Sequence, residues 1–307
     1  MIYPSAAELI GNTPLMRADR FAKAYGIDAN LVVKLESRNP GGSAKDRIAL
    51  KMILGAEERG DLKPGATLIE ATSGNTGVGL GVVAAARGYR VLLTMPESMS
   101  QERRKILEAL GVTIVLTDGQ LGMAGANQRA DELQMETLGS MRMFQFENPD
   151  NPAAHEATTG PEIWRDSDGR VDALIAGVGT GGTISGAGRY LKRQNPNIRI
   201  VAVQPLDSPV LTGGLPSLHG IQGLGANFIP KNYDPLVVDE VVSVSTESSV
   251  EAARLFMRTE GILTGISCGA ALAGARMHME KRGSAGETIV VILPDTGERY
   301  LSTVLFD

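Results

Sequence analysis

The chain has 307 residues, a length typical of one large or two medium domains, and 43% of them are hydrophobic, enough for two cores. Its formal net charge of −5 argues against nucleic acid or another polyanion as the main partner. The single cysteine, Cys268, excludes an internal disulfide framework and a cysteine-based zinc site, and it favours a reducing compartment.

The N-terminus lacks the basic segment and apolar core of a signal peptide. No run of 18 apolar residues occurs, and the most apolar stretch, 78–86, is interrupted by glycines and is too short to cross a bilayer. The three histidines, His155, His219 and His278, show no ligand spacing, so each is interpreted as structural and no metal site is expected. We therefore expect a soluble, cytoplasmic protein that needs neither membrane nor metal.

The first half of the chain alternates short β-branched runs with helical patterns. Strands are expected at 31–35, 67–71, 90–94, 113–116 and 143–146. Helices are expected at 43–59, 78–87 and 122–138, and a further one runs to Leu110 after a capping-box pattern at 98–101.

The second half repeats this alternation. Helices are expected at 152–165, 183–193, 248–259 and 269–281, and strands at 173–176, 198–203, 240–244, 262–264 and 288–293. The stretch 204–235 is rich in glycine and proline and has weak periodicity, which indicates either a functional loop or a missed element.

Strands that alternate with helices predict parallel sheets covered on both faces, and the right-handed crossover rule makes such sheets doubly wound. Two such runs meet near residues 148–152. We therefore predict two α/β domains, 1–148 and 149–307, with part of 13–35 able to pack with the second. Ligands of such sheets bind outside the carboxyl ends of the strands, where the informative loops fall.

The first of these loops leads to Lys45. Asn39-Pro40-Gly41-Gly42 is a turn signal, and the helical pattern opens at Ser43, so Lys45 lies on the first turn of a helix. An ammonium there opposes the positive end of the helix dipole, at a cost of up to about 1 kcal/mol. Lys45 is either an ordinary surface lysine or a nucleophile whose pKa is lowered by its surroundings.

The second loop, 177–183, follows a strand, opens a helix and contains four glycines and two threonines. Its N–H groups and the helix dipole favour a phosphate, although a glycine-rich turn kept for packing is the alternative. It matches G-x-G-x-x-G, but a dinucleotide site needs an acidic residue at the end of the next strand. The next strand ends at Val203-Gln204-Pro205, and no acid occurs before Asp207. A nicotinamide dinucleotide is therefore disfavoured.

Two more loops precede helices. Residues 72–77 carry hydroxyls and an amide but no basic side chain, which favours a carboxylate held by neutral donors over a simple helix cap. Residues 265–269 place Ser267 and Cys268 beside glycines, a pattern that also fits an ordinary N-cap. A lysine nucleophile, a phosphate loop and a carboxylate loop together indicate a phosphorylated aldehyde cofactor bound as an imine.

With these features, the sequence resembles the O-acetylserine sulfhydrylases (cysteine synthases), which are fold-type II pyridoxal-phosphate enzymes related to the tryptophan synthase β chain. The resemblance covers nearly the whole chain. Its motifs lie at 10–15, 39–47, 70–77, 95–104, 145–164, 177–183, 221–225, 265–269 and 297–303. It implies two α/β domains with pyridoxal 5′-phosphate in the cleft between them.

The resemblance also implies residue roles. Lys45 would be the catalytic residue and would carry the cofactor as a Schiff base, Asn75 would bind its ring hydroxyl, and Ser267 would face its pyridine nitrogen. The phosphate would be bound by Gly179, Thr180, Gly181, Gly182 and Thr183. The substrate carboxylate would be bound by Thr72, Ser73, Asn75, Thr76 and Gln145.

The implied reaction forms L-cysteine and acetate from O-acetyl-L-serine and sulfide through an α-aminoacrylate. Use of O-phosphoserine, or of homocysteine as in cystathionine β-synthases, is the alternative. A cytoplasmic homodimer is implied as well. Family members dock the C-terminus of serine acetyltransferase near a histidine that lysine often follows, but here His219 is followed by Gly220, so this partner stays an open alternative.

Overall fold

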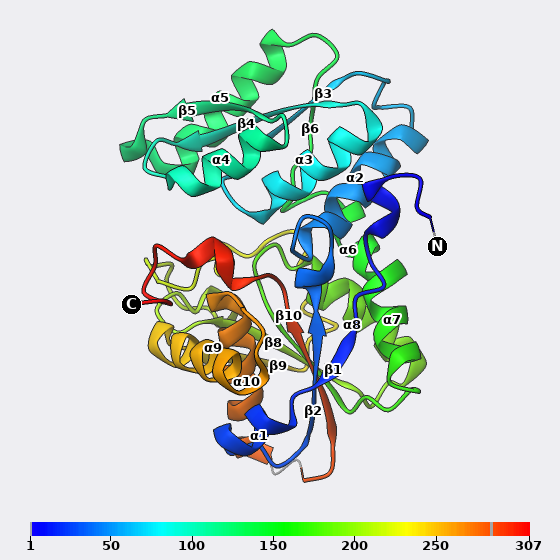
Figure 1. Ribbon diagram of the computed structural model, residues 1–307, viewed down its shortest axis with the longest axis vertical. Coiled ribbons are helices and arrows are strands. Elements are labelled where there is room, and N and C mark those ends of the chain that lie inside the picture. Colours follow the sequence, from blue (N-terminus) through cyan, green and yellow to red (C-terminus); the bar gives the residue numbers. More distant parts are fainter. Residues whose placement is uncertain (1, 283–284) are drawn as a thin grey trace. The chain divides into compact units, whose positions relative to one another are not determined.

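A computed structural model describes residues 2–282 and 285–307 (Figure 1). The chain divides into two compact units. The first comprises the chain start to Ile10 and Asn39–Asn151, and the second comprises Gly11–Arg38 and Pro152–Asp307. None of the helices in the described ranges is long and apolar enough to cross a membrane.

The first unit contains a four-stranded, wholly parallel sheet in the order β5-β4-β3-β6. Its strands are β3 (Thr67–Ala71), β4 (Arg90–Pro96), β5 (Thr113–Thr117) and β6 (Met141–Arg142). Its helices are α2 (Lys45–Glu58), α3 (Asn75–Arg87), α4 (Gln101–Ala109) and α5 (Gly122–Glu136). Ile69 and Ala71 of β3 pack against Ala126, Ala130 and Leu133 of α5, and α2 packs along α3.

The second unit contains a six-stranded sheet in the order β1-β2-β10-β7-β8-β9. Only the β1–β2 pairing is antiparallel. The strands are β1 (Leu15–Arg17), β2 (Asn30–Leu35), β7 (Ala173–Gly177), β8 (Arg199–Pro205), β9 (Glu240–Val244) and β10 (Thr288–Leu293). The helices are α1 (Asp19–Tyr25), α7 (Gly160–Asp166), α8 (Gly182–Gln194), α9 (Thr246–Glu260) and α10 (Ile266–Arg282), and α6 (Asp150–Ala154) precedes α7.

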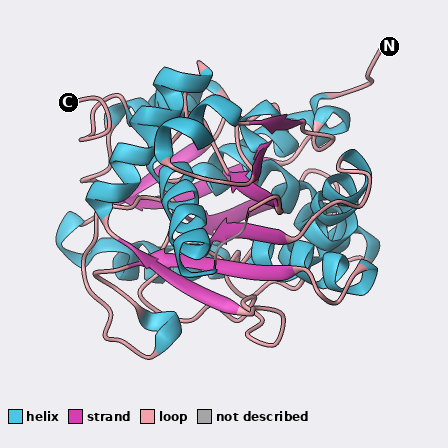
Figure 2. Cartoon of the chain, turned by 90° about the horizontal axis from the view of Figure 1, so that it is seen from below, coloured by secondary structure: helices cyan, strands magenta, loops and turns pink. Residues whose placement is uncertain are grey.

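Helices flank the strands (Figure 2), so the central strands are buried on both faces. In β10, Ile289 and Val291 join one core with α1, α9 and α10, whereas Val290 and Ile292 join a second core with α7 and α8. This two-sided burial explains the continuous apolar runs of these strands. The predicted α/β fold with mainly parallel sheets is confirmed.

Several predicted elements are wrong in place or type. The strand expected at 143–146 is β6, two residues earlier, because Phe144 adopts a left-handed backbone conformation (φ 50°) that ends the strand. Residues 262–264 form no strand, because this segment packs against the loop at Gly297 rather than against a sheet edge. The cap of α4 is Ser100 rather than a box starting at Ser98, and α10 begins at Ile266 rather than at Gly269.

Two further differences concern elements around the sheets. The helix expected at 152–165 is a continuous helical run, but it contains a π-helical turn at His155–Thr159 between α6 and α7. Pro161 lies just beyond this turn and lacks the N–H that a regular α-helix would use, which accounts for the irregularity. The short elements β1 and α1 were not expected from the sequence at all.

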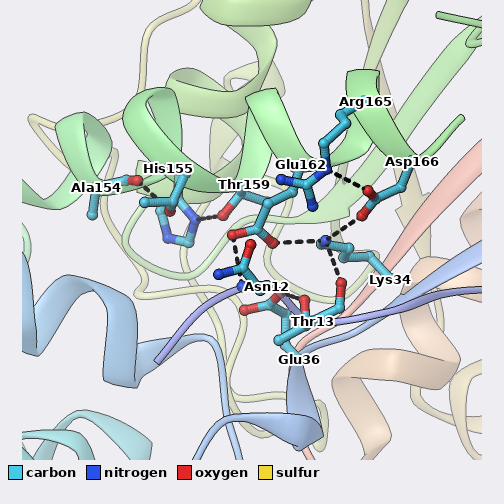
Figure 3. Close-up of polar contacts among 11 residues, drawn as sticks. Asn12, Thr13, Lys34, Glu36, Ala154, His155, Thr159, Glu162, Arg165 and Asp166 are labelled. Atoms are coloured by element: carbon cyan, nitrogen blue, oxygen red, sulfur yellow. Dashed lines mark hydrogen bonds and ion pairs between the residues drawn. The ribbon is translucent and has the colours of Figure 1, made fainter. Parts of the chain in front are cut away.

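A buried ion pair joins strand β2 to helix α7 in the second unit (Figure 3). Lys34 Nζ of β2 is 2.7 Å from Glu162 Oε2 of α7 and donates to the Thr13 carbonyl at 2.6 Å. Glu162 Oε1 accepts the backbone N–H of Asn12 at 2.9 Å, and the Thr13 hydroxyl donates to Glu36 Oε1 at 2.7 Å. Strand β2, helix α7 and the 12–13 segment are therefore held by one charged network.

We expect Lys34→Met to destabilise the second unit by about 3–5 kcal/mol, because it leaves the Glu162 carboxylate buried without its cation. Urea unfolding measures this loss. The matched control is Lys192→Met in the same unit, which removes a partly exposed pair with Asp239 and should cost at most about 1 kcal/mol. If the two variants lose the same free energy of unfolding, the buried Lys34–Glu162 pair contributes no more to stability than an exposed pair does.

Candidate active site

Lys45 is the first residue of α2, and its backbone N–H donates to Ser43 Oγ at 3.2 Å. The turn before it is fixed as well, because Gly41 N donates to Asp46 Oδ2 at 2.5 Å. A β-carbon on Gly79 of α3 would lie 2.8 Å from the Lys45 carbonyl oxygen, so the backbones of the two helices are in direct contact. The Lys45 side chain is half-buried and starts from a backbone that cannot shift easily.

The loop at 72–76 connects β3 to α3, with Gly74 at the N-cap and Asn75 as the first helical residue. Thr72 Oγ1 accepts the N–H of Gly74 at 3.2 Å. The Thr76 hydroxyl donates to Gln145 Oε1 at 2.6 Å, and both side chains are buried. The first unit therefore joins two predicted carboxylate ligands that are 69 residues apart in sequence.

Asn75, the first residue of α3, and Ser73, in the loop just before its N-cap, are half-buried. Asn75 precedes Gly79 by one helical turn, and Gly79 contacts the backbone of Lys45. The first unit consequently places Lys45, Asn75 and the 72–76 loop around the first turns of α2 and α3. The N–H groups of these turns favour an anion, and the residues 72–77 contribute only neutral side chains.

The loop at 177–182 connects β7 to α8 in the second unit. A β-carbon on Gly179 would lie 2.5 Å from the Gly223 carbonyl oxygen, and one on Gly181 would lie 2.8 Å from the backbone of Tyr233. Gly181 is also the left-handed N-cap of α8, with φ 83°. Only glycine fits at either position, and such a glycine-rich turn before a helix is the kind of loop whose backbone N–H groups can bind a phosphate.

Thr183 is the second residue of α8, directly after this loop, and it is positioned by a histidine that was expected from the sequence to have only a structural role. Thr183 Oγ1 lies 3.1 Å from His155 Nε2, and His155 Nδ1 lies 2.9 Å from Thr159 Oγ1. His155 is buried in the π-helical turn (Figure 3). The only sequence signal for this arrangement was Pro161, which marks the irregular helix that turns His155 toward α8.

Ser267 lies in the first turn of α10 and is buried. A β-carbon on Gly223 would lie 3.5 Å from Ser267 Oγ, and Gly223 O is also the neighbour of Gly179. The second unit therefore brings Ser267 and the glycine loop to the same 221–225 segment. Backbone N–H groups, threonine hydroxyls and one serine hydroxyl form a donor set that fits the phosphate and the ring nitrogen of pyridoxal phosphate.

Cys268, next to Ser267, does not add a nucleophile. Its Sγ is buried and 3.5 Å from both Asp295 Oδ1 and the Asp295 carbonyl oxygen. Burial, together with the nearby Asp295 carboxylate, raises the pKa of the Cys268 thiol well above its usual value. The thiol stays protonated at physiological pH and packs as part of the core.

Comparisons with known proteins show the family of the chain. The family model described as pyridoxal-phosphate dependent enzyme matches residues 6–295. Cysteine synthase A of Escherichia coli (strain K12) is 51% identical over 314 residues, covering 99% of this chain and 96% of that protein. A crystal structure of cysteine synthase from Entamoeba histolytica superposes with a TM-score of 0.95 at 42% identity, covering 100% and 91% of the two chains. A crystal structure of O-ureido-L-serine synthase has the same TM-score at 44% identity, covering 100% and 96%.

We expect Gly181→Ala to weaken binding of pyridoxal phosphate by about tenfold or more, because the new β-carbon meets the Tyr233 backbone and displaces the loop. Titration of the cofactor-free protein with pyridoxal phosphate, followed by absorbance, measures the affinity. Gly213→Ala is the matched control, since Gly213 has a similar φ of 85° but open space around it. Both variants should lose similar stability from backbone strain. Equal cofactor affinity in the two variants would contradict a phosphate-binding role for the Gly181 loop.

Proposed function

The chain belongs to the pyridoxal-phosphate-dependent enzymes, and within this family we propose that it forms L-cysteine and acetate from O-acetyl-L-serine and sulfide. The observation that carries the proposal is the contact of the Lys45 backbone with α3, because the first turn of α3 contains Thr76, the hydrogen-bond partner of Gln145. A lysine for an aldehyde cofactor and a carboxylate site for an amino acid are thereby joined in one unit. Half the residues of cysteine synthase A are shared along its length, which supports the specific reaction.

The cofactor, when bound, withdraws electrons from the substrate α-carbon, and a neutral serine at its ring nitrogen favours prompt elimination of acetate. Lys45 Nζ would hold the cofactor through its aldehyde, and the same Nζ would act as the base that takes the proton from the substrate α-carbon and as the acid that returns it. The loop from Gly179 to Thr183 anchors the phosphate. Asn75 and Ser267 orient the ring through its hydroxyl and its nitrogen.

The substrate carboxylate is held by Thr72, Ser73, Asn75, Thr76 and Gln145. Because Gln145 Oε1 accepts from the Thr76 hydroxyl, the amide of Gln145 has a fixed orientation, and its NH₂ end is the end that donates to a carboxylate. Neutral donors at the first turn of α3 bind an anion while adding no positive side chain. This suits a substrate whose leaving group is an uncharged acetyl ester.

The alternative donors are less well supported. O-Phosphoserine carries a second anion, and residues 72–77 contain no lysine or arginine to bind it. Homocysteine use of the cystathionine β-synthase type is not favoured either, because the curated relatives at about half identity over nearly the full chain are cysteine synthases.

We further propose a cytoplasmic homodimer, on the basis of family membership. The single, buried cysteine is compatible with a reducing compartment. Sedimentation velocity of the purified protein tests the dimer. Serine acetyltransferase is the second partner to test, with a peptide that has the C-terminal sequence of this enzyme from the same organism. If the peptide binds the 72–76 loop, it should inhibit the reaction competitively with O-acetylserine.

Absorbance spectroscopy tests the reaction itself. The purified protein should be yellow, and O-acetylserine should shift its visible band before sulfide restores it and cysteine appears. A protein that stays colourless after addition of pyridoxal phosphate would contradict the enzyme assignment. If the visible band does not change with O-acetylserine but shifts with serine plus homocysteine, the alternative reaction of the cystathionine β-synthase type is favoured.

We expect Lys45→Ala to reduce cysteine formation by about 10³-fold or more, because no other group takes over the proton transfer at the α-carbon. The variant should still bind some cofactor through the Gly179–Thr183 loop. Borohydride, which reduces the imine between cofactor and lysine to a stable bond, should no longer attach the cofactor to the peptide that contains residues 45–51. Lys51→Ala is the matched control on the same helix, since Lys51 forms a 4.0 Å ion pair with the exposed Glu58. Undiminished activity of Lys45→Ala would refute its role.

A further inference from the structure

The segment that follows β10 has no role in the reaction as described above, although it contains the start of one of the motifs on which the resemblance rests. Asp295 lies two residues after Leu293, the last residue of β10, and a 3₁₀ turn covers Gly297–Tyr300. Asp295 and Tyr300 are 2% and 3% exposed. The Tyr300 hydroxyl donates to Asp295 Oδ2 at 2.5 Å, so the two side chains form one buried pair with a fixed geometry.

This buried pair packs against the backbone that leads into α10. A β-carbon on Gly265 would collide with Asp295 Oδ1 and would lie 2.6 Å from Tyr300 Cε2. A β-carbon on Gly297 would lie 3.0 Å from the Thr264 backbone nitrogen. The backbone at 264–265 is therefore in direct contact with the segment 295–300, and a shift of one requires a shift of the other.

Asp295 also contacts the chain on the other side of Ser267. Cys268 Sγ lies 3.5 Å from Asp295 Oδ1 and 3.5 Å from the Asp295 carbonyl oxygen. The Cys268 backbone N–H donates to the Gly265 carbonyl at 3.1 Å, which closes the turn between them. Gly265 precedes Ser267 and Cys268 follows it, and both contact the same carboxyl group. The backbone that carries Ser267 is consequently held at both ends by Asp295.

The position of this backbone determines where the Ser267 hydroxyl can lie. Ser267 is 3% exposed, and a β-carbon on Gly223 would lie 3.5 Å from its Oγ, so the hydroxyl group is enclosed on that side as well. A hydroxyl group donates well only to an acceptor at about 3 Å or less and close to a straight line. A displaced turn at 265–268 would therefore weaken the hydrogen bond to the ring nitrogen of the cofactor.

We propose that Asp295 is a positioning residue for Ser267, because it holds the turn at 265–268 that carries the Ser267 hydroxyl. This inference rests on the proposed function, which places that hydroxyl at the ring nitrogen. The contacts described above are with the Tyr300 hydroxyl, the Cys268 thiol and the Gly265 backbone, all of them neutral, so contact rather than charge carries the effect. A displaced hydroxyl supports electron withdrawal from the substrate α-carbon less well, and the loss of acetate slows.

The first test is NMR of the protein with pyridoxal phosphate that is labelled with nitrogen-15 at the ring. The nitrogen-15 signal reports the hydrogen bond at the ring nitrogen, and the phosphorus signal reports the phosphate site. We expect Asp295→Ala to move the nitrogen-15 signal in the same direction as Ser267→Ala does, with the phosphorus signal unchanged. Asp295→Asn keeps the shape of the side chain and an acceptor for Tyr300, so it should keep the signal of the unmodified protein.

The rate of acetate loss provides a second readout. At saturating O-acetylserine without sulfide, Asp295→Ala should lose acetate about tenfold more slowly, the effect of one misplaced hydrogen bond. The O-acetylserine concentration that gives half of this rate should change by less than about twofold, because the Thr76–Gln145 pair lies in the first unit. In the Ser267→Ala background, Asp295→Ala should cause no further slowing, because both residues act through one hydroxyl group.

Asp172→Ala is the matched control, because Asp172 binds the opposite end of β10, where it accepts the Thr288 N–H at 2.7 Å. It should lower the thermal midpoint and leave the nitrogen-15 signal and the acetate rate unchanged. If Asp295→Ala does not fold, Tyr300→Phe replaces it, since it removes the bond to Asp295 and keeps the ring against Gly265. Tyr300→Phe should move the nitrogen-15 signal in the same direction and slow acetate loss about threefold.

A nitrogen-15 signal and an acetate rate equal to those of the unmodified protein, in Asp295→Ala or in its replacement Tyr300→Phe, would overturn the inference. The same holds if Asp295→Asn behaves like Asp295→Ala, since charge would then be the cause, or if the effects of Asp295→Ala and Ser267→Ala multiply. Failure of the proposed function would look different, because the unmodified protein would then release no acetate from O-acetylserine, while the NMR comparison needs only the bound cofactor.

Discussion

A β-carbon on Gly79 would lie 2.8 Å from the Lys45 carbonyl oxygen, and one on Gly179 would lie 2.5 Å from the Gly223 carbonyl oxygen. In both units, backbone touches backbone at the point from which a functional group projects. Protein interiors are close-packed and deform little, so such contacts locate the backbone more tightly than contacts between flexible side chains do. The directions of the Lys45 side chain and of the α8 N–H groups therefore depend on the lack of a side chain at Gly79 and at Gly179.

The two units treat buried charge in opposite ways. Lys34 and Glu162 are paired at 2.7 Å and connect three segments of the second unit, so removal of Lys34 leaves the buried Glu162 carboxylate without this cation. Glu70 in the first unit has Arg142 only at 3.9 Å and one oxygen without a partner among the described residues. The first arrangement stabilises the fold, whereas the second places an incompletely paired carboxyl group beside the 72–76 loop.

Local pattern was sufficient to predict the strands at 67–71, 240–244 and 288–293, the α/β class, and the loops where strands give way to helices. It was insufficient where the deciding contact is remote in sequence. Thr183 depends on His155, and Gln145 depends on Thr76. The end of β6 was misplaced because Phe144 has a left-handed backbone conformation that is imposed by its surroundings. Glycine and asparagine are the residues that usually mark such a conformation in a sequence, and position 144 has neither.

The order of strands in the second unit has a consequence for synthesis of the chain on the ribosome. Strand β2 pairs with β10, with Asn30 opposite Thr288, whereas the sheet of the first unit is contained within Asn39–Asn151. At about 5–20 residues per second, β2 waits on the order of ten seconds or more for its partner to emerge. The first unit can complete its sheet during that interval, while the apolar face of β2 has no permanent partner. Chaperone demand during translation should therefore fall mainly on the N-terminal strands of the second unit.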